Sequence, residues 1–142
     1  MMYLLDTNVV SELRKFRSGR ADKNVVAWIG VSDPRQSFIS AITLLELEYG
    51  ALLMERRDAR QGEGLRRWLE ETVVGVFDTR ILPIDGHVAR VCAGLHIPDH
   101  KPERDALIGA TAIAAGFTLV TRNVRDFEGM PVKLFNPWEP VD

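Results

Sequence analysis

The sequence has little of several features that mark particular protein classes. It holds one cysteine, Cys92, which excludes an internal disulfide, suits a reducing cytoplasm and is expected to fill core space. No apolar run approaches the roughly 18 residues of a membrane span. The apolar residues 1–5 meet Asp6 too early for a signal peptide, which needs a basic region and a longer apolar one. We therefore expect a cytoplasmic protein without a membrane partner.

The chain also lacks internal repeats, low-complexity tracts and any linker rich in proline or glycine. Its 142 residues are enough to bury one core and too few for two ordinary domains. Hydrophobic residues make up 46% and charged residues 27%, which is typical of globular chains and argues against disorder. The sequence thus predicts a single domain over residues 1–142.

An excess of positive charge, which nucleic-acid-binding proteins usually carry, is missing as well, because the formal net charge is −2. A metal site built from carboxylates lowers the net charge by itself, so clustering of basic residues is more informative than the total. The N-terminal basic cluster is Arg14, Lys15, Arg17 and Arg20, and the central basic cluster is Arg56, Arg57, Arg60, Arg66 and Arg67. Each cluster is either a solvated helix face or a surface for binding a polyanion.

What the chain does contain is an alternation of short apolar strands and helices. Strands are predicted at residues 3–5, 36–40, 81–84, 117–120 and 132–135. Helices are predicted from Thr7 through Arg14, from Asp22 through Ile29, over an apolar face from Leu44 to Leu53, around residues 65–76, from Asp85 through Leu95, and from Pro102 to a stop at Gly116. This alternation indicates an α/β fold with a parallel sheet covered by helices on both faces.

Acidic or amide side chains stand at strand ends and inside apolar segments. Asp6 follows the first strand, and Asn123 and Asp126 follow the fourth. Glu46 interrupts an apolar segment, and Asp105 lies near the start of an apolar helix. In a parallel sheet the ligand site lies beyond the carboxyl ends of the strands, and an isolated carboxylate in apolar surroundings is costly. If these groups converge, they need a cation to neutralise them.

Oxygen ligands, with one cysteine and few histidines, favour Mg²⁺ or Mn²⁺ over zinc. Such an ion lowers the pKa of a bound water and can hold that water in line with a phosphodiester. Each residue also has a structural interpretation: Asp6 as a helix cap, Asp105 as a charge at the positive end of its helix, and Asn123 as a turn residue. The histidines are interpreted as surface or core residues rather than ligands: His87, His96 and His100.

Four stretches, in order and over nearly the whole chain, resemble the PIN-domain family, and within it the VapC-like toxins that include the FitB-like ones. They are Leu4–Asn8 with Ser11 and Glu12 close behind, Ser40–Leu47, Arg104–Ala112 and Leu119–Phe127, and the ending Asn136–Trp138 is similar too. The resemblance implies a three-layer α/β/α sandwich with a central parallel sheet. It also implies a Mg²⁺-dependent endoribonuclease, with Mn²⁺ able to substitute, that acts as the toxin of a type II toxin–antitoxin pair.

The same resemblance assigns roles to individual residues. The catalytic set is Asp6, Glu46, Asp105 and Asn123. Asp6 and Asp105 are the main metal ligands, and Glu46 completes the site directly or through water. Asn123 occupies the position of the family's fourth acidic residue, which is a departure because an amide brings no charge. Asp126 is the candidate for the missing carboxylate, although it suits a turn equally well, and one Mg²⁺ per subunit is the preferred count.

Supporting residues and partners follow from the resemblance as well. Thr7 and Asn8 are expected to support the metal ligands, and Thr121 to shape the pocket. The expected partners are an RNA substrate, a second copy of the chain in a homodimer, and a cognate VapB-like antitoxin whose own DNA-binding domain provides the only link to DNA. The antitoxin is expected to cover the active site, placing an arginine among the carboxylates.

Three other functions can be compared with the same residues. A PIN module with weak or no nuclease activity, serving mainly as the partner of a DNA-binding antitoxin, is permitted by Asn123 and opposed by the three retained carboxylates. A haloacid-dehalogenase-type phosphatase requires a second aspartate two positions after Asp6, where Asn8 stands. A response-regulator receiver requires an aspartate acceptor directly after its third strand, where Asp85 instead begins a helix. The last two are rejected on those residues.

Overall fold

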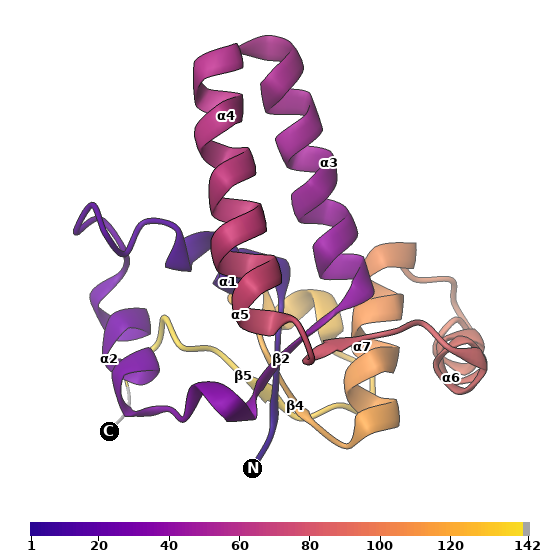
Figure 1. The fold of residues 1–142 in the computed structure, drawn as a ribbon. Coiled ribbons are helices and arrows are strands. Elements are labelled where there is room, and N and C mark those ends of the chain that lie inside the picture. The colour runs from indigo at the N-terminus through magenta and orange to yellow at the C-terminus, as the bar shows by residue number, and fades with distance from the viewer. Residues whose placement is uncertain (141–142) are drawn as a thin grey trace.

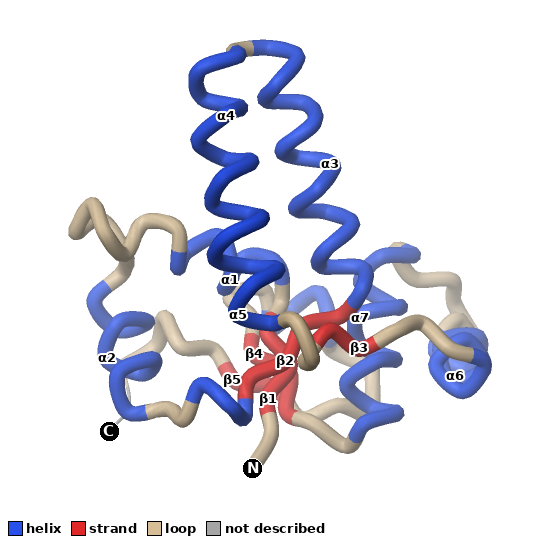
Figure 2. The backbone as a smooth tube through the Cα atoms, viewed as in Figure 1, coloured by secondary structure: helices blue, strands red, loops and turns tan. Residues whose placement is uncertain are grey.

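A five-stranded parallel sheet lies at the centre of the computed structural model, which describes residues 1–140. Its strands are β1 (Tyr3–Leu5), β2 (Ser37–Ser40), β3 (Ile81–Leu82), β4 (Thr118–Val120) and β5 (Leu134–Phe135). The spatial order is β3-β2-β1-β4-β5 (Figure 2). Every neighbouring pair is parallel. The predicted α/β class with a central parallel sheet is confirmed.

The helices connect successive strands, as parallel pairing requires. They are α1 (Thr7–Leu13), α2 (Lys23–Val31), α3 (Ala41–Arg57), α4 (Ala59–Trp68), α5 (Gly75–Phe77), α6 (Gly86–Leu95) and α7 (Glu103–Ala115), with short turns η1 (Pro34–Gln36), η2 (Leu69–Val74) and η3 (Val124–Phe127). Helices α3 and α4 form a long hairpin that projects away from the sheet (Figure 1). No helix within residues 1–140 is both long and apolar enough to cross a membrane.

Alternating side chains of the strands supply two cores, one on each face of the sheet. Leu4 and Leu119 belong to the core beneath α6 and α7, whereas their neighbours Leu5 and Val120 belong to the core beneath α1, α3 and η2. This follows from the two-residue repeat of a strand, which sends successive side chains to opposite faces. All four of these side chains are almost completely buried, and Cys92 fills space in the first core as expected. The result is the three-layer arrangement.

Local capping residues set the helix boundaries. Asp22, Ser40 and Asp85 accept backbone N–H bonds at the starts of α2, α3 and α6. Gly116 ends α7 with φ of 72°, a left-handed conformation that glycine adopts without steric cost. Helix α1 begins at Thr7 as predicted, and Asp6 is its capping residue, accepting from the Thr7 backbone N–H.

Several boundaries differ from the prediction. The strands predicted at 81–84 and 132–135 are only two residues long, because each pairs with its single neighbouring strand at two positions. The helix predicted around 65–76 begins at Ala59 and passes through a π-helical turn at Leu69–Val74 before α5. On α3, Leu45, Leu52 and Leu53 are about half exposed, so part of its apolar face is left uncovered by this chain.

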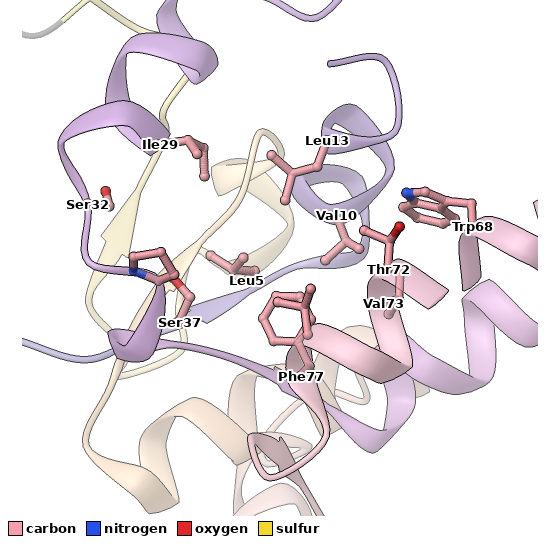
Figure 3. Close-up of a pocket in the computed structure, with 12 residues that line it drawn as sticks. Leu5, Val10, Leu13, Ile29, Ser32, Ser37, Trp68, Thr72, Val73 and Phe77 are labelled. Carbon is pink, nitrogen blue, oxygen red and sulfur yellow. The ribbon is translucent and has the colours of Figure 1, made fainter. Parts of the chain in front are cut away.

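A small cavity lies on the α2 side of the sheet, between α1, α2, η1 and the segment from α4 to α5 (Figure 3). Its volume is about 130 Å³, and its walls include Leu5, Val10, Ile29 and Phe77. None of the residues that line it has an acidic or basic side chain. The chemistry predicted for this chain therefore has to lie elsewhere.

Candidate active site and metal centre

The acidic residues gather where the strand order changes direction. From β1 the chain proceeds to β2 and β3 on one side, and then returns to place β4 and β5 on the other side. Ligand sites of open α/β sheets form outside the carboxyl ends of the strands at such a point. Here β1 ends at Leu5 and β4 at Val120, and the backbone N–H of Asp6 donates to the Val120 carbonyl at 2.9 Å.

Asp6 is held by three neighbours and is only 7% exposed. Its Oδ2 accepts hydrogen bonds from Thr121 Oγ1 at 2.8 Å and Asn8 Nδ2 at 3.1 Å, and its Oδ1 accepts from the Thr7 backbone at 2.8 Å. Burial raises the pKa of Asp6 above its usual value, the three hydrogen bonds lower it in part, and the charge of Glu46 raises it again. The carboxylate is therefore rigidly placed and short of positive charge.

Glu46 reaches the same place from α3. One of its oxygens, Oε1, accepts a hydrogen bond from Thr7 Oγ1 at 2.7 Å, and Oε2 lies 3.7 Å from Arg104 Nη1. The Thr7 hydroxyl also lies 3.1 Å from Thr43 Oγ1, a fully buried residue of the same helix. Thr7 thus links the first turn of α1 to α3 and fixes Glu46 beside Asp6.

Asp105 enters from the first turn of α7. Its half-buried carboxylate has a raised pKa, first because of burial and then because of the charges of Asp126, Asp6 and Glu46, in that order. Within residues 1–140 no group donates a hydrogen bond to this carboxylate, so its oxygens remain available to water or to an ion. The structure brings Asp6, Glu46 and Asp105 into one region, and Asp126 lies close enough to affect it.

The fourth acidic position behaves differently from the other three. Asn123 is exposed and precedes η3, and its backbone N–H donates to Thr121 Oγ1 at 3.0 Å. The side chain of Asp126, within η3, is also exposed. Asn8 links this loop to Asp6, because its Oδ1 accepts from the Arg122 backbone at 3.2 Å. Of the two candidates, Asp126 is the one whose charge reaches Asp105.

The donors available here are all oxygen atoms, which suits a hard divalent cation. Burial and mutual repulsion hold the pKa values of Asp6 and Asp105 up, and a cation would relieve both effects. Within the described residues, no three of the acidic site's carboxylates have ligand atoms that all lie within 4.8 Å of one another. An ion would therefore contact one or two carboxylates directly and the others through water, which is how Mg²⁺ usually binds.

A second group of possible ligands lies at the loop between α6 and α7. Ligand atoms of His96, His100 and Glu103 all lie within 4.8 Å of one another. However, His96 Nδ1 accepts a hydrogen bond from the Lys101 backbone at 3.0 Å, which uses the single lone pair that a neutral imidazole can offer a metal. His96 thus has a structural role in closing the loop.

Two residues of the stretches that resemble the family, Arg104 and Glu12, have structural roles that the sequence did not indicate. Arg104 lies 3.7 Å from Glu46 and stacks over the Tyr49 ring at 5.8 Å, although the sequence placed it only at the start of the stretch Arg104–Ala112. Glu12 is only 6% exposed, and it binds Lys15 Nζ at 3.1 Å and the Asp22 backbone at 2.7 Å. Glu12 therefore holds both ends of the loop after α1 by hydrogen bonds, a role that depends on tertiary packing.

Comparison with known proteins gives consistent matches. A family model described as the PIN domain matches residues 3–132. The VapC ribonuclease Y4jK of Sinorhizobium fredii is 37% identical over 148 residues, covering 99% of this chain and 100% of that protein. Toxin FitB of Neisseria gonorrhoeae is 36% identical over 143 residues, covering 96% and 99%. A chain in the structure of FitAB bound to an IR36 DNA fragment aligns with a TM-score of 0.87 and 31% identity over 99% of both chains.

Proposed function

Because the chain belongs to the PIN domain family, we propose that it is a metal-dependent endoribonuclease that hydrolyses RNA phosphodiester bonds as the toxin of a VapBC-like toxin–antitoxin pair. The observation that carries the proposal is the convergence of Asp6, Glu46 and Asp105 at the carboxyl ends of β1 and β4. Relatives named as ribonucleases match nearly the full length of the chain, which supports the same reaction. We propose that the protein acts on RNA in the cytoplasm.

The ion would be Mg²⁺, with Mn²⁺ able to replace it, held chiefly by Asp6 and Asp105 with Glu46 contributing directly or through water. When bound, it would lower the pKa of a water molecule and neutralise charge that builds up on the phosphate. Asp126 is the candidate for a fourth carboxylate because its charge acts on Asp105. Asn123 brings no charge, so we propose one ion per subunit.

The chain's own residues fix this site before any substrate arrives. Thr121 and Asn8 hold one oxygen of Asp6, and the Thr7 backbone holds the other. The Thr7 hydroxyl donates to Oε1 of Glu46, and Arg104 lies 3.7 Å from Oε2, so both oxygens of this carboxylate are positioned by the chain. Positioning of this kind reduces the reorganisation needed in the transition state. Asp105 accepts no hydrogen bond from residues 1–140 and is free to bind water.

Partners are proposed from the relatives and from the surface of α3. The FitAB structure that this chain resembles is a protein complex bound to DNA, and we propose a cognate antitoxin that provides the DNA contact here. Leu45, Tyr49, Leu52 and Leu53 lie on one face of α3 and are each 47–55% exposed. Exposed apolar faces of this kind mark association surfaces, so we propose that α3 contributes to a homodimer.

The decisive experiment compares the wild type with Asp6→Asn and Asp105→Asn. Purified protein is incubated with RNA and Mg²⁺, and cleavage products are followed on gels with and without a chelator. We expect cleavage by the wild type only, and none after chelation. Asp78→Asn, which changes an exposed carboxylate at the end of α5, is the matched control and should cleave normally. Undiminished cleavage by both active-site variants would refute the assigned roles.

A second candidate function is a weakly active PIN module that mainly binds a DNA-binding antitoxin, and the exposed amide at Asn123 favours it. Expression in a bacterial host, with and without the neighbouring reading frame, separates the two functions. Growth arrest that depends on Asp6 and is relieved by the neighbour supports a toxin. Operon repression by the pair, without growth arrest or cleavage by the wild type, supports the module.

A further inference from the structure

A groove of about 830 Å³ leads away from the acidic site, between the loop after α1 on one side and α3 and α4 on the other. Thr7 and Glu46 line it, so it is continuous with the site described above. Arg14, Lys15, Arg17 and Arg20 line the loop side. The whole N-terminal basic cluster therefore faces this groove.

The two basic clusters differ in how many of their arginines are in ion pairs. Within residues 1–140, Arg14, Arg17 and Arg20 form no ion pair, so their charges are available to a ligand. In the central basic cluster, by contrast, Arg66 is surrounded by Glu48, Glu55 and Glu70 at 2.5, 2.9 and 3.5 Å.

The remaining arginines of the central cluster are either remote from the acidic site or paired with a glutamate. Arg56 and Arg57 lie at the far end of α3, about 15 Å along the helix from Glu46. Arg60 begins the return helix at the same end of the hairpin. Arg67 pairs with Glu63 at 3.4 Å. Of the two clusters, only the N-terminal one lines the groove beside the acidic site, and within residues 1–140 its three arginines form no ion pair, whereas Lys15 pairs with Glu12 at 3.1 Å.

The loop that carries this cluster is anchored at both ends. Glu12, buried at the end of α1, accepts hydrogen bonds from Lys15 near the start of the loop and from the Asp22 backbone at its end. The backbone N–H of Arg20 donates to the Lys15 carbonyl at 3.3 Å, which folds the loop back on itself. The arginines are therefore presented from a defined loop.

The opposite wall of the groove is partly apolar and includes an aromatic ring. Leu65 and Trp68 of α4 line it, and both are partly exposed. Trp68 also borders the small apolar cavity, at whose edge it stands in Figure 3. Sites for single-stranded nucleic acid combine cationic side chains, which bind the phosphates, with aromatic rings, on which the bases stack.

The size of the groove points to the same ligand. A volume of about 830 Å³ is that of a pocket for a drug-sized molecule, which is comparable to a few nucleotides and too small for a duplex. Bases can stack on a side chain only when they are unpaired. Resting on the proposed ribonuclease function, we propose that this groove binds a short single-stranded RNA segment beside the cleaved phosphate, with Arg14, Arg17 and Arg20 on its phosphates and Trp68 against a base.

The test measures RNA affinity in the non-cleaving Asp105→Asn background. A fluorescently labelled single-stranded oligoribonucleotide is titrated with that protein and with the additional triple change Arg14→Gln, Arg17→Gln and Arg20→Gln, at several salt concentrations. Each phosphate contact to a single strand contributes about 0.7 to the slope of log affinity against log salt. Loss of three contacts is expected to reduce the slope by about 2 and the affinity about 100-fold at roughly 0.1 M salt.

A matched control removes the same charge elsewhere. The control variant carries Arg60→Gln, Arg90→Gln and Lys133→Gln. These three residues lie on α4, on α6 and next to β5; they are exposed and do not line the groove. We expect this variant to bind RNA nearly as well as its parent, and a duplex of the same sequence to bind more weakly than the single strand. Equal losses in both triple variants, or preferential duplex binding, would overturn the proposal.

Trp68 is tested separately through its fluorescence. RNA is expected to quench tryptophan emission in the parent, and the quench is expected to disappear in Trp68→Phe, where Trp28 and Trp138 remain. An unchanged quench would remove Trp68 from the RNA site.

Three outcomes separate this proposal from the ribonuclease function. If the wild type cleaves RNA and the arginine variant, with Asp105 intact, cleaves with an unchanged KM, the groove assignment fails while the function stands. If the wild type cleaves no RNA, the function fails, and the affinities still report on the groove. If the arginine changes leave RNA affinity intact but weaken inhibition by the antitoxin, the groove is a protein-docking site and the proposal is wrong.

Discussion

Replacing Asp105 by asparagine should stabilise the metal-free protein while abolishing its stabilisation by Mg²⁺. The carboxylate lies half-buried near three others, Asp126, Asp6 and Glu46, and receives no hydrogen bond from residues 1–140 that the substitution would break. Asparagine has nearly the same shape and carries no charge. The change thus removes repulsion without opening a cavity.

The expected size follows from the partial exposure of the site. Like-charge pairs screened by solvent are worth a few tenths of a kcal/mol each, so three neighbours together amount to about 1 kcal/mol. For a chain of 142 residues, about 1 kcal/mol corresponds to roughly 4 °C in Tm. Mg²⁺ at about 100 times its Kd would add about 2.7 kcal/mol, or roughly 10 °C, to the wild type alone.

The sign of the pH dependence follows from the raised pKa of Asp105 in the folded state. The protonated carboxyl is favoured by folding, so its contribution to stability is fully present below the unfolded pKa of about 3.9 and is lost as pH rises through the folded pKa. The advantage of Asp105→Asn should therefore be small near about pH 4 and reach its full size once pH exceeds the folded pKa.

Thermal unfolding followed by circular dichroism, with a chelator or with Mg²⁺ at several pH values, measures both effects. Asp78→Asn is the matched control, because it changes an exposed carboxylate outside the site. A variant that is less stable than the wild type in chelator at neutral pH, or that is stabilised by Mg²⁺ as much as the wild type, would show that Asp105 neither repels its neighbours nor binds the ion.

Three further changes test the site, the hairpin and the proposed dimer. Thr121→Val removes the hydroxyl that binds Asp6 and should cost about 1–2 kcal/mol of unfolding free energy and weaken Mg²⁺ binding, measured by calorimetry; unchanged metal affinity would contradict its role. Gly62→Ala places a methyl against the backbone of Glu55 where α3 and α4 cross and should cost about 1–3 kcal/mol in denaturant unfolding; a neutral effect would mean that the helices separate freely. Leu52→Asp on the exposed face of α3 should convert a dimer to a monomer in light scattering, and an unchanged mass would exclude this face.

The local features of this fold could be predicted because they depend on neighbouring residues. Apolar strands, capping aspartates and the glycine that ends α7 act within one turn of the chain, so their approximate positions follow from the sequence. Predictions were least accurate at the short edge strands and in the segment from α4 to α5. There the lengths depend on what packs against the segment rather than on its own composition.

The candidate site illustrates the same division. Asp6, Glu46 and Asp105 were selected from the sequence because each is an acid in an apolar setting or at a strand end. Their convergence depends on the order of the strands, which places β4 beside β1. This order brings Thr121 into hydrogen-bond contact with Asp6, although the two residues are 115 positions apart in the sequence. Although Arg104 belongs to the stretch Arg104–Ala112, its contact with Glu46 could not be predicted, since exposed arginines near helix starts are common.

The sequence by itself determined the alternation of strands and helices, the oxygen character of the ligands and the presence of two basic clusters, because these are properties of residue type and short-range spacing. Only the tertiary structure decided which of the clusters faces the acidic site. Glu48, Glu55 and Glu70 converge on Arg66 through the packing of α3 against α4, while buried Glu12 turns the loop of Arg14 and Arg17 toward the groove. Whether a charge is paired or available depends on such contacts between distant residues.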